Sequence, residues 1–175
     1  MSTTTDTTPR VYLADLAAYN RGILHGLWVD ATDVEYLQGG VQQLIDTSPI
    51  DGAEEFAIHD YEGFGPFTVG EYDPLAHVAS IGAAIAKGGD AFAAWVADAP
   101  DYNTDPEVFR DRFMGEYTDT EHLGRSLAEC AGIELTDDHP LAGYVDFAGY
   151  ARDQLLSGEL LSIPFAEGIY VYATR

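Results

Sequence analysis

Apolar residues in the first third of the chain follow the patterns of short strands around one helix. Alternating or continuous apolar runs predict strands at Val11–Ala14, Ile23–Val29 and Glu55–Asp60. Between the last two, apolar residues three and four positions apart predict a helix that follows the N-cap residue Asp33 and extends to Ile45. This part of the chain is therefore predicted to be a small α+β unit.

Apolar residues in the middle of the chain have helical spacing instead. Ala-rich segments predict helices over Leu75–Lys87 and Ala91–Ala97. Gly88 and Gly89 separate the two segments, because paired glycines disfavour a continuous helix.

Two more helices are predicted before residue 135. One starts at Asp105-Pro106, where Pro fits the first helical turn, and continues through an apolar stripe that includes Phe113 and Met114. The other runs from Thr120, its predicted cap, to Ala131. Several short helices in succession predict a small helical bundle.

The last part of the chain mixes a helix with strands. Asp146 is the predicted N-cap of a helix that extends to Leu156 and buries Tyr150. Leu160–Pro164 and Gly168–Tyr172 are predicted to form a terminal hairpin. The chain is thus mixed, then helical, then mixed again, which predicts the α+β fold class.

The charge of the chain restricts its partners. Its 175 residues are 46% hydrophobic and 12% aromatic, which predicts a folded core rather than a disordered acidic tail. Against 30 Asp and Glu residues stand 8 Lys and Arg residues, for a net charge of −22. Such a surface repels DNA phosphates and anionic lipids, so we expect neither nucleic acid nor membrane as a partner and favour a basic one.

Three further features of the sequence indicate a soluble, cytoplasmic protein. The single cysteine, Cys130, cannot form an internal disulfide. Residues 1–9 form a polar tail rich in Ser and Thr, without the basic start and apolar run of a signal peptide. No segment of the sequence approaches the ~20 apolar residues of a membrane helix.

Motifs for catalysis or metal binding are sparse in the sequence. The segment from His59 to Glu62 resembles part of a metal site, but a solvated or hydrogen-bonded histidine is the favoured interpretation. The sequence has no HExxH pattern, phosphate-binding glycine motif or nucleophile elbow, and Cys130 is interpreted as a small buried helix residue. No catalytic residue, metal site or cofactor is predicted, although an acid/base pair of the glycosidase type stays open.

The acidic residues are spread over the chain beside the apolar positions rather than within them. On a helix, side chains three or four positions apart stand about 5–6 Å from each other, which is comparable to the spacing of phosphates along a DNA strand. A row of carboxylates on a rigid scaffold therefore presents negative charge at nearly the pitch of DNA. The alternative is that the acidic surface only keeps the protein soluble or suits a salt-rich cytoplasm.

Three parts of the sequence resemble the ArdA antirestriction family. The first comprises YLADLAAYNRG at Tyr12–Gly22 and GLWVD at Gly26–Asp30. The second is EEFAIHDYEGF at Glu54–Phe64, and the third is YVDFAGYARD at Tyr144–Asp153. These parts have the order and spacing of the family and, with the helical middle, cover nearly the whole chain.

The resemblance implies a DNA mimic carried by mobile genetic elements. Members of the family are elongated, curved chains of three small domains that form homodimers. They occupy the DNA-binding groove in the methyltransferase core of Type I restriction-modification enzymes, without catalysis or a cofactor. For this chain, the element pattern and the resemblance together predict an N-terminal α+β domain over 10–70, a central helical domain over 71–135 and a C-terminal α+β domain over 136–175. The polar composition of residues 1–9 predicts a flexible tail that extends beyond the usual start of the family.

Two sets of candidate residues follow from this interpretation. The candidate DNA-mimic carboxylates are Asp51, Glu54, Glu55, Asp60, Glu62, Glu71, Asp73, Asp98, Asp101, Asp105, Glu107, Asp111, Glu116, Asp119 and Glu121. The candidate dimer interface comprises Ile163, Pro164, Phe165 and Tyr170. Two other functions stay open, namely a small acidic hydrolase that uses a carboxylate pair and an acidic, salt-adapted binding module.

Overall fold

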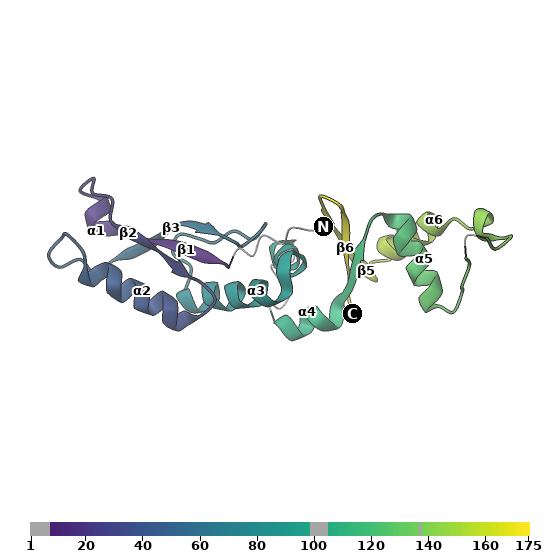
Figure 1. Cartoon of the computed structure of the whole chain (residues 1–175), viewed down its shortest axis with the longest axis horizontal. Coiled ribbons are helices and arrows are strands. Elements are labelled where there is room, and N and C mark those ends of the chain that lie inside the picture. The colour runs from purple at the N-terminus through teal and green to yellow at the C-terminus, as the bar shows by residue number, and fades with distance from the viewer. Residues whose placement is uncertain (1–7, 99–104, 137) are drawn as a thin grey trace. The chain divides into compact units, whose positions relative to one another are not determined.

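The computed structural model describes residues 8–98, 105–136 and 138–175 of the chain (Figure 1). Over these residues the protein is mixed α+β, with six α-helices and two three-stranded antiparallel sheets, which confirms the predicted fold class. The chain divides into two compact units, unit 1 (Met1–Pro106) and unit 2 (Glu107–Arg175). The division into three domains stays a prediction, and the predicted tail lies outside the described residues as far as residue 7.

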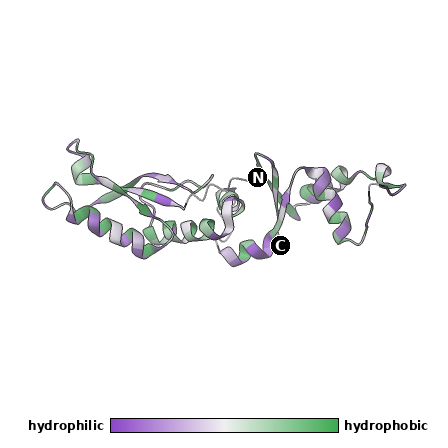
Figure 2. Cartoon of the chain, viewed as in Figure 1, coloured by the Kyte–Doolittle hydropathy of each residue, from purple (hydrophilic) through white to green (hydrophobic). Residues whose placement is uncertain are grey.

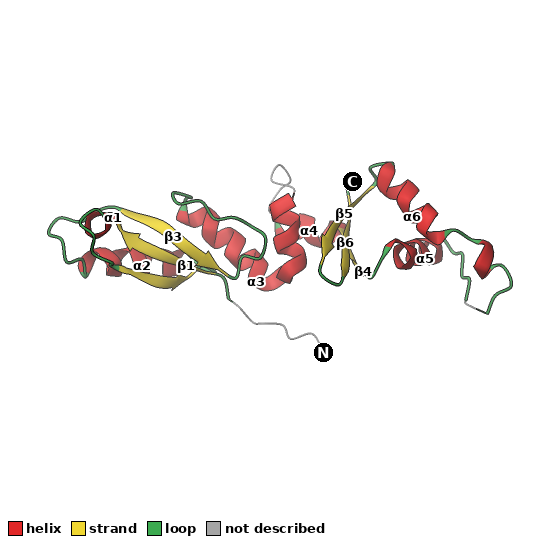
Figure 3. Ribbon diagram, turned by 90° about the horizontal axis from the view of Figure 1, so that it is seen from above, coloured by secondary structure: helices red, strands yellow, loops and turns green. Residues whose placement is uncertain are grey.

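Unit 1 is a three-stranded sheet with α2 against one face and α3 packed beside α2 (Figure 3). Its elements are β1 (Arg10–Asp15), α1 (Leu16–Tyr19), β2 (Gly26–Asp30), α2 (Val34–Asp46), β3 (Phe56–Glu62) and α3 (Leu75–Asp98). β1 is the central strand and pairs antiparallel with both β2 and β3. On the α2 side of β1, Val11 and Leu13 are fully buried.

The second strand begins later than its apolar pattern predicts. Ile23 and Leu24 lie in the loop before β2, and Leu24 is 90% exposed, so their assignment to the strand is wrong. The cause is the short helix α1, in which the Asp15 side chain accepts a hydrogen bond from Ala18 N at 3.1 Å. The N–H of Ile23 then donates to Ala18 O at 3.0 Å, which holds this residue in the turn instead of in the sheet.

Helix α2 starts where the sequence predicts. Its N-cap is Asp33, whose Oδ1 accepts a hydrogen bond from Glu35 N at 2.8 Å. Gly40 allows the helix to approach the sheet closely, because a Cβ there would lie 2.5 Å from Cγ2 of Val29 on β2. A Cβ at Gly39 would meet nothing within 4 Å. Of these two neighbouring glycines, only Gly40 is required by the packing.

Helix α3 consists of two helical segments joined at the predicted break. Gly89 has φ 64° and ψ −159°, a conformation outside the helical region that favours glycine. On the C-terminal side of the break, Phe92 and Trp95 are buried. Figure 2 shows α3 mostly in white and green, in accord with its buried, Ala-rich sequence.

Unit 2 consists of a second sheet with one helix before its first strand in the sequence and two helices between its first and second strands. Its elements are α4 (Pro106–Arg112), which begins at the boundary, β4 (Phe113–Tyr117), α5 (Thr120–Cys130), the 3₁₀ turn η1 (Ala142–Tyr144), α6 (Phe147–Leu156), β5 (Leu160–Phe165) and β6 (Gly168–Ala173). The strand order is β4-β6-β5, and all neighbours are antiparallel. The predicted terminal hairpin is thus confirmed as β5 and β6.

The prediction that Phe113 and Met114 continue the preceding helix is wrong. Both residues belong to β4, where Phe113 pairs with Tyr172 of β6. The Phe113 ring stacks on Phe109 of α4 at a centroid distance of 5.2 Å. Strand pairing with a distant part of the chain therefore overrides the local helical spacing, and the expected helical middle contains a strand.

Helices α5 and α6 pack against each other at very close range. A Cβ on Gly124 of α5 would lie 1.9 Å from the backbone oxygen of Phe147 at the start of α6. Asp119, not the predicted Thr120, is the N-cap of α5, whereas Asp146 caps α6 as predicted. Tyr150 was expected on the buried side of α6 but is 39% exposed, because Phe147 and Ala151 occupy that side.

Candidate interaction surface

Seven of the candidate carboxylates lie on and around β3 in unit 1. They are Asp51, Glu54 and Glu55 before the strand, Asp60 and Glu62 within it, and Glu71 and Asp73 in the loop before α3. Glu62 and Asp73 are half-buried and the other five are exposed. The N–H of Ile58 on β3 donates to Glu71 O at 2.9 Å, which holds the second loop along the outer edge of this strand. The fold therefore brings acids from three segments together.

The exposed phenol of Tyr72 is influenced by two of these carboxylates. The hydrogen bond that Glu71 accepts and the negative charge of Glu71 raise the pKa of Tyr72, and the charge of Glu55 adds to the effect. Both interactions penalise the phenolate, which would add a further negative charge. Tyr72 is 71% exposed, so these carboxylates act on a group that water reaches.

Few cations neutralise the carboxylates of unit 1. Arg10 forms an ion pair with Glu62, and the His59 Nε2 atom lies 3.9 Å from Glu71 Oε1. Among the described residues, no basic side chain forms an ion pair with Asp51 or Glu54. Most of the charge around β3 is thus directed to solvent.

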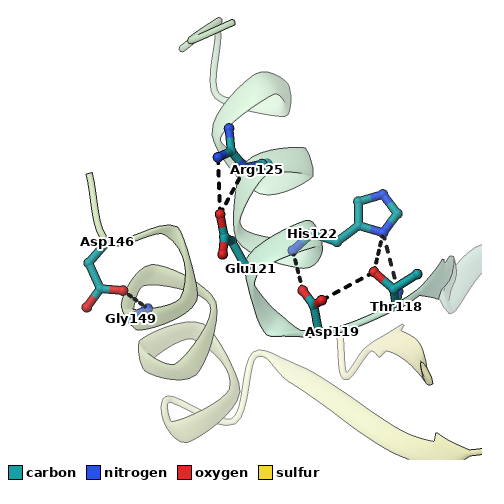
Figure 4. Close-up of polar contacts among 7 residues, drawn as sticks. All are labelled: Thr118, Asp119, Glu121, His122, Arg125, Asp146 and Gly149. Carbon is teal, nitrogen blue, oxygen red and sulfur yellow. Dashed lines mark hydrogen bonds and ion pairs between the residues drawn. The ribbon is translucent and has the colours of Figure 1, made fainter. Parts of the chain in front are cut away.

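The candidate carboxylates of unit 2 follow α4, β4 and the start of α5. Glu107, Asp111, Glu116, Asp119 and Glu121 are all exposed. Glu107 lies 3.3 Å from Arg110, and Glu121 lies 3.1 Å from Arg125, which are ion pairs within α4 and α5 (Figure 4 shows the second). At exposed sites such pairs contribute little to stability and leave the carboxylates accessible.

Asp119 has a structural task as well as a place on the surface. Its Oδ1 accepts a hydrogen bond from His122 N at 2.9 Å, and Thr118 Oγ1 donates to its Oδ2 at 3.4 Å (Figure 4). The hydrogen bond from His122 N–H is the main cause that lowers the pKa of Asp119. The Asp119 carboxylate therefore stabilises the start of α5 as its N-cap and also adds a negative charge to the surface.

The remaining candidate carboxylates come from the segment between α3 and α4. Asp98 is exposed at the end of α3, and Asp105 is half-buried just before α4. Asp101 lies outside the described residues. Asp98 and Asp105 belong to unit 1, as do the acids around β3, whereas Glu107 and the acids after it belong to unit 2.

Asp15 is the one charged side chain that is buried within the described ranges. Burial opposes its ionisation, but Ser48 Oγ donates a hydrogen bond to Oδ2 at 2.5 Å and Ala18 N donates one to Oδ1 at 3.1 Å. These donors outweigh burial and hold the pKa of Asp15 below its usual value. Asp15 therefore fixes α1 and the loop after α2 and does not belong to the exposed surface.

The four candidate interface residues of the hairpin contribute mainly to unit 2 itself. Ile163 on β5 and Tyr170 on β6 are cross-strand partners, and both are buried. The ring of Phe165 stacks on Tyr170 at a centroid distance of 4.2 Å. Pro164 is exposed. Their role in a dimer stays a prediction.

Sequence reasoning missed an aromatic pair on the sheet of unit 1. Tyr12 of β1 lies directly opposite Trp28 of β2, with their ring centroids 5.6 Å apart. Two exposed acids lie on the same sheet, Asp30 on β2 and Asp60 on β3. The signal was present in the alternation of the strands, since Tyr12 and Trp28 are each flanked by residues that face the core.

The described residues form neither a metal site nor a membrane-spanning helix. Within residues 8–98, 105–136 and 138–175, no group of three or more His, Cys, Asp or Glu side chains is arranged to hold a metal ion. His59 instead contacts the Tyr19 ring edge-on at 4.8 Å. Among the helices that the structure describes, none combines the length and apolar character that crossing a membrane requires.

The fold and this surface define a class of protein, namely a strongly acidic α+β protein with carboxylates from both units at its surface. Comparison with known families identifies the particular one. The family model described as antirestriction protein (ArdA) matches residues 11–167, and the chain belongs to this family. A comparison with curated proteins found no match.

Proposed function

We propose that this protein inhibits Type I restriction-modification enzymes by presenting its carboxylates in place of DNA phosphates. The target site is the DNA-binding groove of the methyltransferase core, which is basic because it binds DNA. The protein occupies this groove in the cytoplasm as a competitive inhibitor and carries out no catalysis. Membership of an antirestriction family supports the biological outcome, and the charge of the surface supports the mechanism.

The placement of the acids is the observation that carries this proposal. None of the 14 candidate carboxylates within the described ranges is buried. An enzyme that used a carboxylate pair would need only two of them at one site. A mimic needs many, because each phosphate-like contact is weak at a screened surface and the contacts act together.

The net charge also has the magnitude that a mimic requires. Two copies of the chain would carry about −44, which equals the charge of roughly 22 base pairs of DNA. We propose that the protein acts as a homodimer, with the β5–β6 hairpin at the contact between copies. The three-domain division at residues 70 and 135 belongs to the same proposal.

A restriction assay tests the proposal directly. A Type I enzyme is mixed with unmodified DNA and increasing amounts of the protein, and both cleavage and methylation are followed. We expect protection of the DNA near stoichiometric amounts, and weaker protection as salt rises. Uninhibited cleavage at a large excess of protein would refute the proposal for that enzyme.

Matched variants show whether particular carboxylates act. In the first variant, Asp51→Asn, Glu54→Gln and Glu55→Gln remove three exposed charges that make no ion pair among the described residues. In the second, Glu129→Gln, Glu134→Gln and Asp153→Asn remove three exposed charges outside both the candidate set and the β5–β6 hairpin. We expect the first to inhibit less well, with a flatter salt dependence, and the second to resemble the wild type. An equal loss in both would assign the effect to net charge alone.

A further inference from the structure

The face of the unit 1 sheet that points away from α2 carries an aromatic pair. Side chains alternate along a strand, so Val11 and Leu13 point toward the helix layer and Tyr12 points to the opposite face. Trp28 shares that opposite face and is 39% exposed. The Tyr12 ring lies across Gly26, where a Cβ would come within 2.5 Å of the ring. Both aromatic side chains are thus held in place by paired strands.

A cation already occupies this face. The guanidinium carbon of Arg10 lies 5.1 Å from the centroid of the Trp28 ring, and the same side chain pairs with Glu62. A guanidinium group stacks on aromatic faces and pairs with carboxylates, which makes arginine a favoured residue at interfaces. The position of Arg10 shows that this face binds a guanidinium group.

Carboxylates outnumber this one cation. In the register of the sheet, Arg10 lies between Asp30 of β2 and Glu62 of β3, and Tyr12 lies beside Asp60. Asp30 and Asp60 are exposed, and neither forms an ion pair among the described residues. The face keeps a negative charge that Arg10 does not balance, so it still attracts a second cation.

We infer that this face, formed by Tyr12 and Trp28 with Asp30, Asp60 and Glu62, receives an arginine side chain from the basic surface of the protein's target. The inference rests on the proposed function and adds to it a specific, partly apolar contact. Carboxylates alone resemble phosphates, and their contribution weakens with salt. An indole ring stacked on a guanidinium also excludes water, so its contribution persists at higher salt.

Substitutions of Trp28 test this contact in the restriction assay. Trp28→Leu removes the aromatic ring but keeps an apolar side chain, and we expect about 10-fold more protein for half-maximal inhibition. The slope of inhibition against salt should stay unchanged, because no charge is lost. Trp28→Phe should recover most of the loss. Tyr36→Leu is the matched control, since Tyr36 is also an exposed aromatic residue (58%) but lies on α2, on the other side of the sheet.

A peptide titration tests the cation preference without the enzyme. Hexa-arginine is added to the protein, and tryptophan emission is compared with that of Trp28→Phe, so that the difference reports Trp28. Trp95, the second tryptophan, is 1% exposed and serves as a constant background. We expect hexa-arginine to change the Trp28 emission more than hexa-lysine does. Arg10→Gln, which removes the resident guanidinium, should bind hexa-arginine more tightly than the wild type.

The outcomes separate this inference from the proposed function. If the wild type protects DNA but Trp28→Leu protects equally well, the inference is wrong and the carboxylate mimic stands. If the wild type gives no protection but hexa-arginine changes the Trp28 emission as expected, the proposed function is wrong and the cation-binding face stands. Equal responses to hexa-arginine and hexa-lysine would contradict the arginine preference.

Discussion

Replacing Asp15 by alanine should destabilise unit 1 far more than replacing an exposed acid. The matched pair is Asp15→Ala and Asp51→Ala, because each variant removes one negative charge from a chain of net charge −22. The relief of self-repulsion is then similar in the two variants. What differs is the local structure, since Asp15 is fully buried and Asp51 is exposed.

The magnitude follows from the hydrogen bonds of Asp15. Alanine would leave Ala18 N–H and the Ser48 hydroxyl group without their acceptor in a cluster that includes Ala18, Ile50 and Ala53. A buried donor without a partner costs about 1–3 kcal/mol, while removal of the buried charge offsets part of this loss. We expect a loss of about 2–3 kcal/mol for Asp15→Ala, and a change within about 0.5 kcal/mol for Asp51→Ala.

Tryptophan fluorescence provides the assay. Both tryptophans, Trp28 and Trp95, lie in unit 1, so their emission during urea or thermal unfolding reports this unit. For a unit of this size the expected loss lowers the midpoint temperature of Asp15→Ala by roughly 10–20 °C. Asp15→Asn should recover part of it, because the amide oxygen can still cap α1. Equal midpoints for Asp15→Ala and Asp51→Ala would refute the structural role of Asp15.

Three further predictions concern pH, a helix cap and a pair of glycines. The pKa of Asp15 is lower in the folded protein than in the unfolded chain, where it is about 3.9. The stabilising effect of the ionised side chain is therefore complete above about pH 3.9 and is lost as the pH falls through the folded-state pKa. We expect the difference in unfolding free energy between wild type and Asp15→Asn, measured by urea unfolding, to shrink below about pH 4. Asp119→Ala should lower the midpoint of unit 2 by several degrees in circular dichroism, and Asp119→Asn should not, because asparagine preserves the cap to His122 N. Gly39 is a helix position where a Cβ would meet nothing, so Gly39→Ala should stabilise unit 1 by about 0.5–1 kcal/mol. Gly40→Ala should destabilise unit 1 by about 1–3 kcal/mol, because its Cβ would overlap Val29. Equal effects of the two glycine substitutions in urea unfolding would contradict the close approach of α2 to β2.

The sequence predicted those elements whose ends are determined by capping residues or glycines at the ends themselves. The helix after Asp33, the break at Gly89 and the helix after Asp146 are all found where capping and glycine chemistry place them. The hairpin of β5 and β6 is also a local feature, since only Ala166 and Glu167 separate its two strands. Each of these signals acts within a few residues, so a sequence is sufficient to detect it.

Elements that depend on distant partners could not be predicted in this way. Phe113 has a helical neighbourhood, but its strand is stabilised by pairing with Tyr172, far away in the sequence. The position of Glu71 beside β3 likewise involves partners distant in the sequence, since Ile58 N–H donates a hydrogen bond to Glu71 O and the Glu71 side chain lies near His59. For the candidate surface, composition indicated that the acids are exposed, whereas the burial of Asp15 depends on Ser48, a partner that no local pattern reveals.

Aspartate N-caps reconcile the large negative charge with a stable fold. With 8 basic residues against 30 acids, ion pairs cannot balance the charge. Four helices begin instead at Asp15, Asp33, Asp119 and Asp146, whose carboxylates accept backbone N–H groups at the positive ends of the helices. Because an amide is a neutral donor, each cap stabilises its helix and leaves the net charge of the protein intact. The last three of these caps are exposed, so they hold the scaffold and contribute to the anionic surface at once. Substitution by asparagine removes the charge but keeps the cap. It thereby separates the contribution of the carboxylate to stability from its contribution to binding of the target.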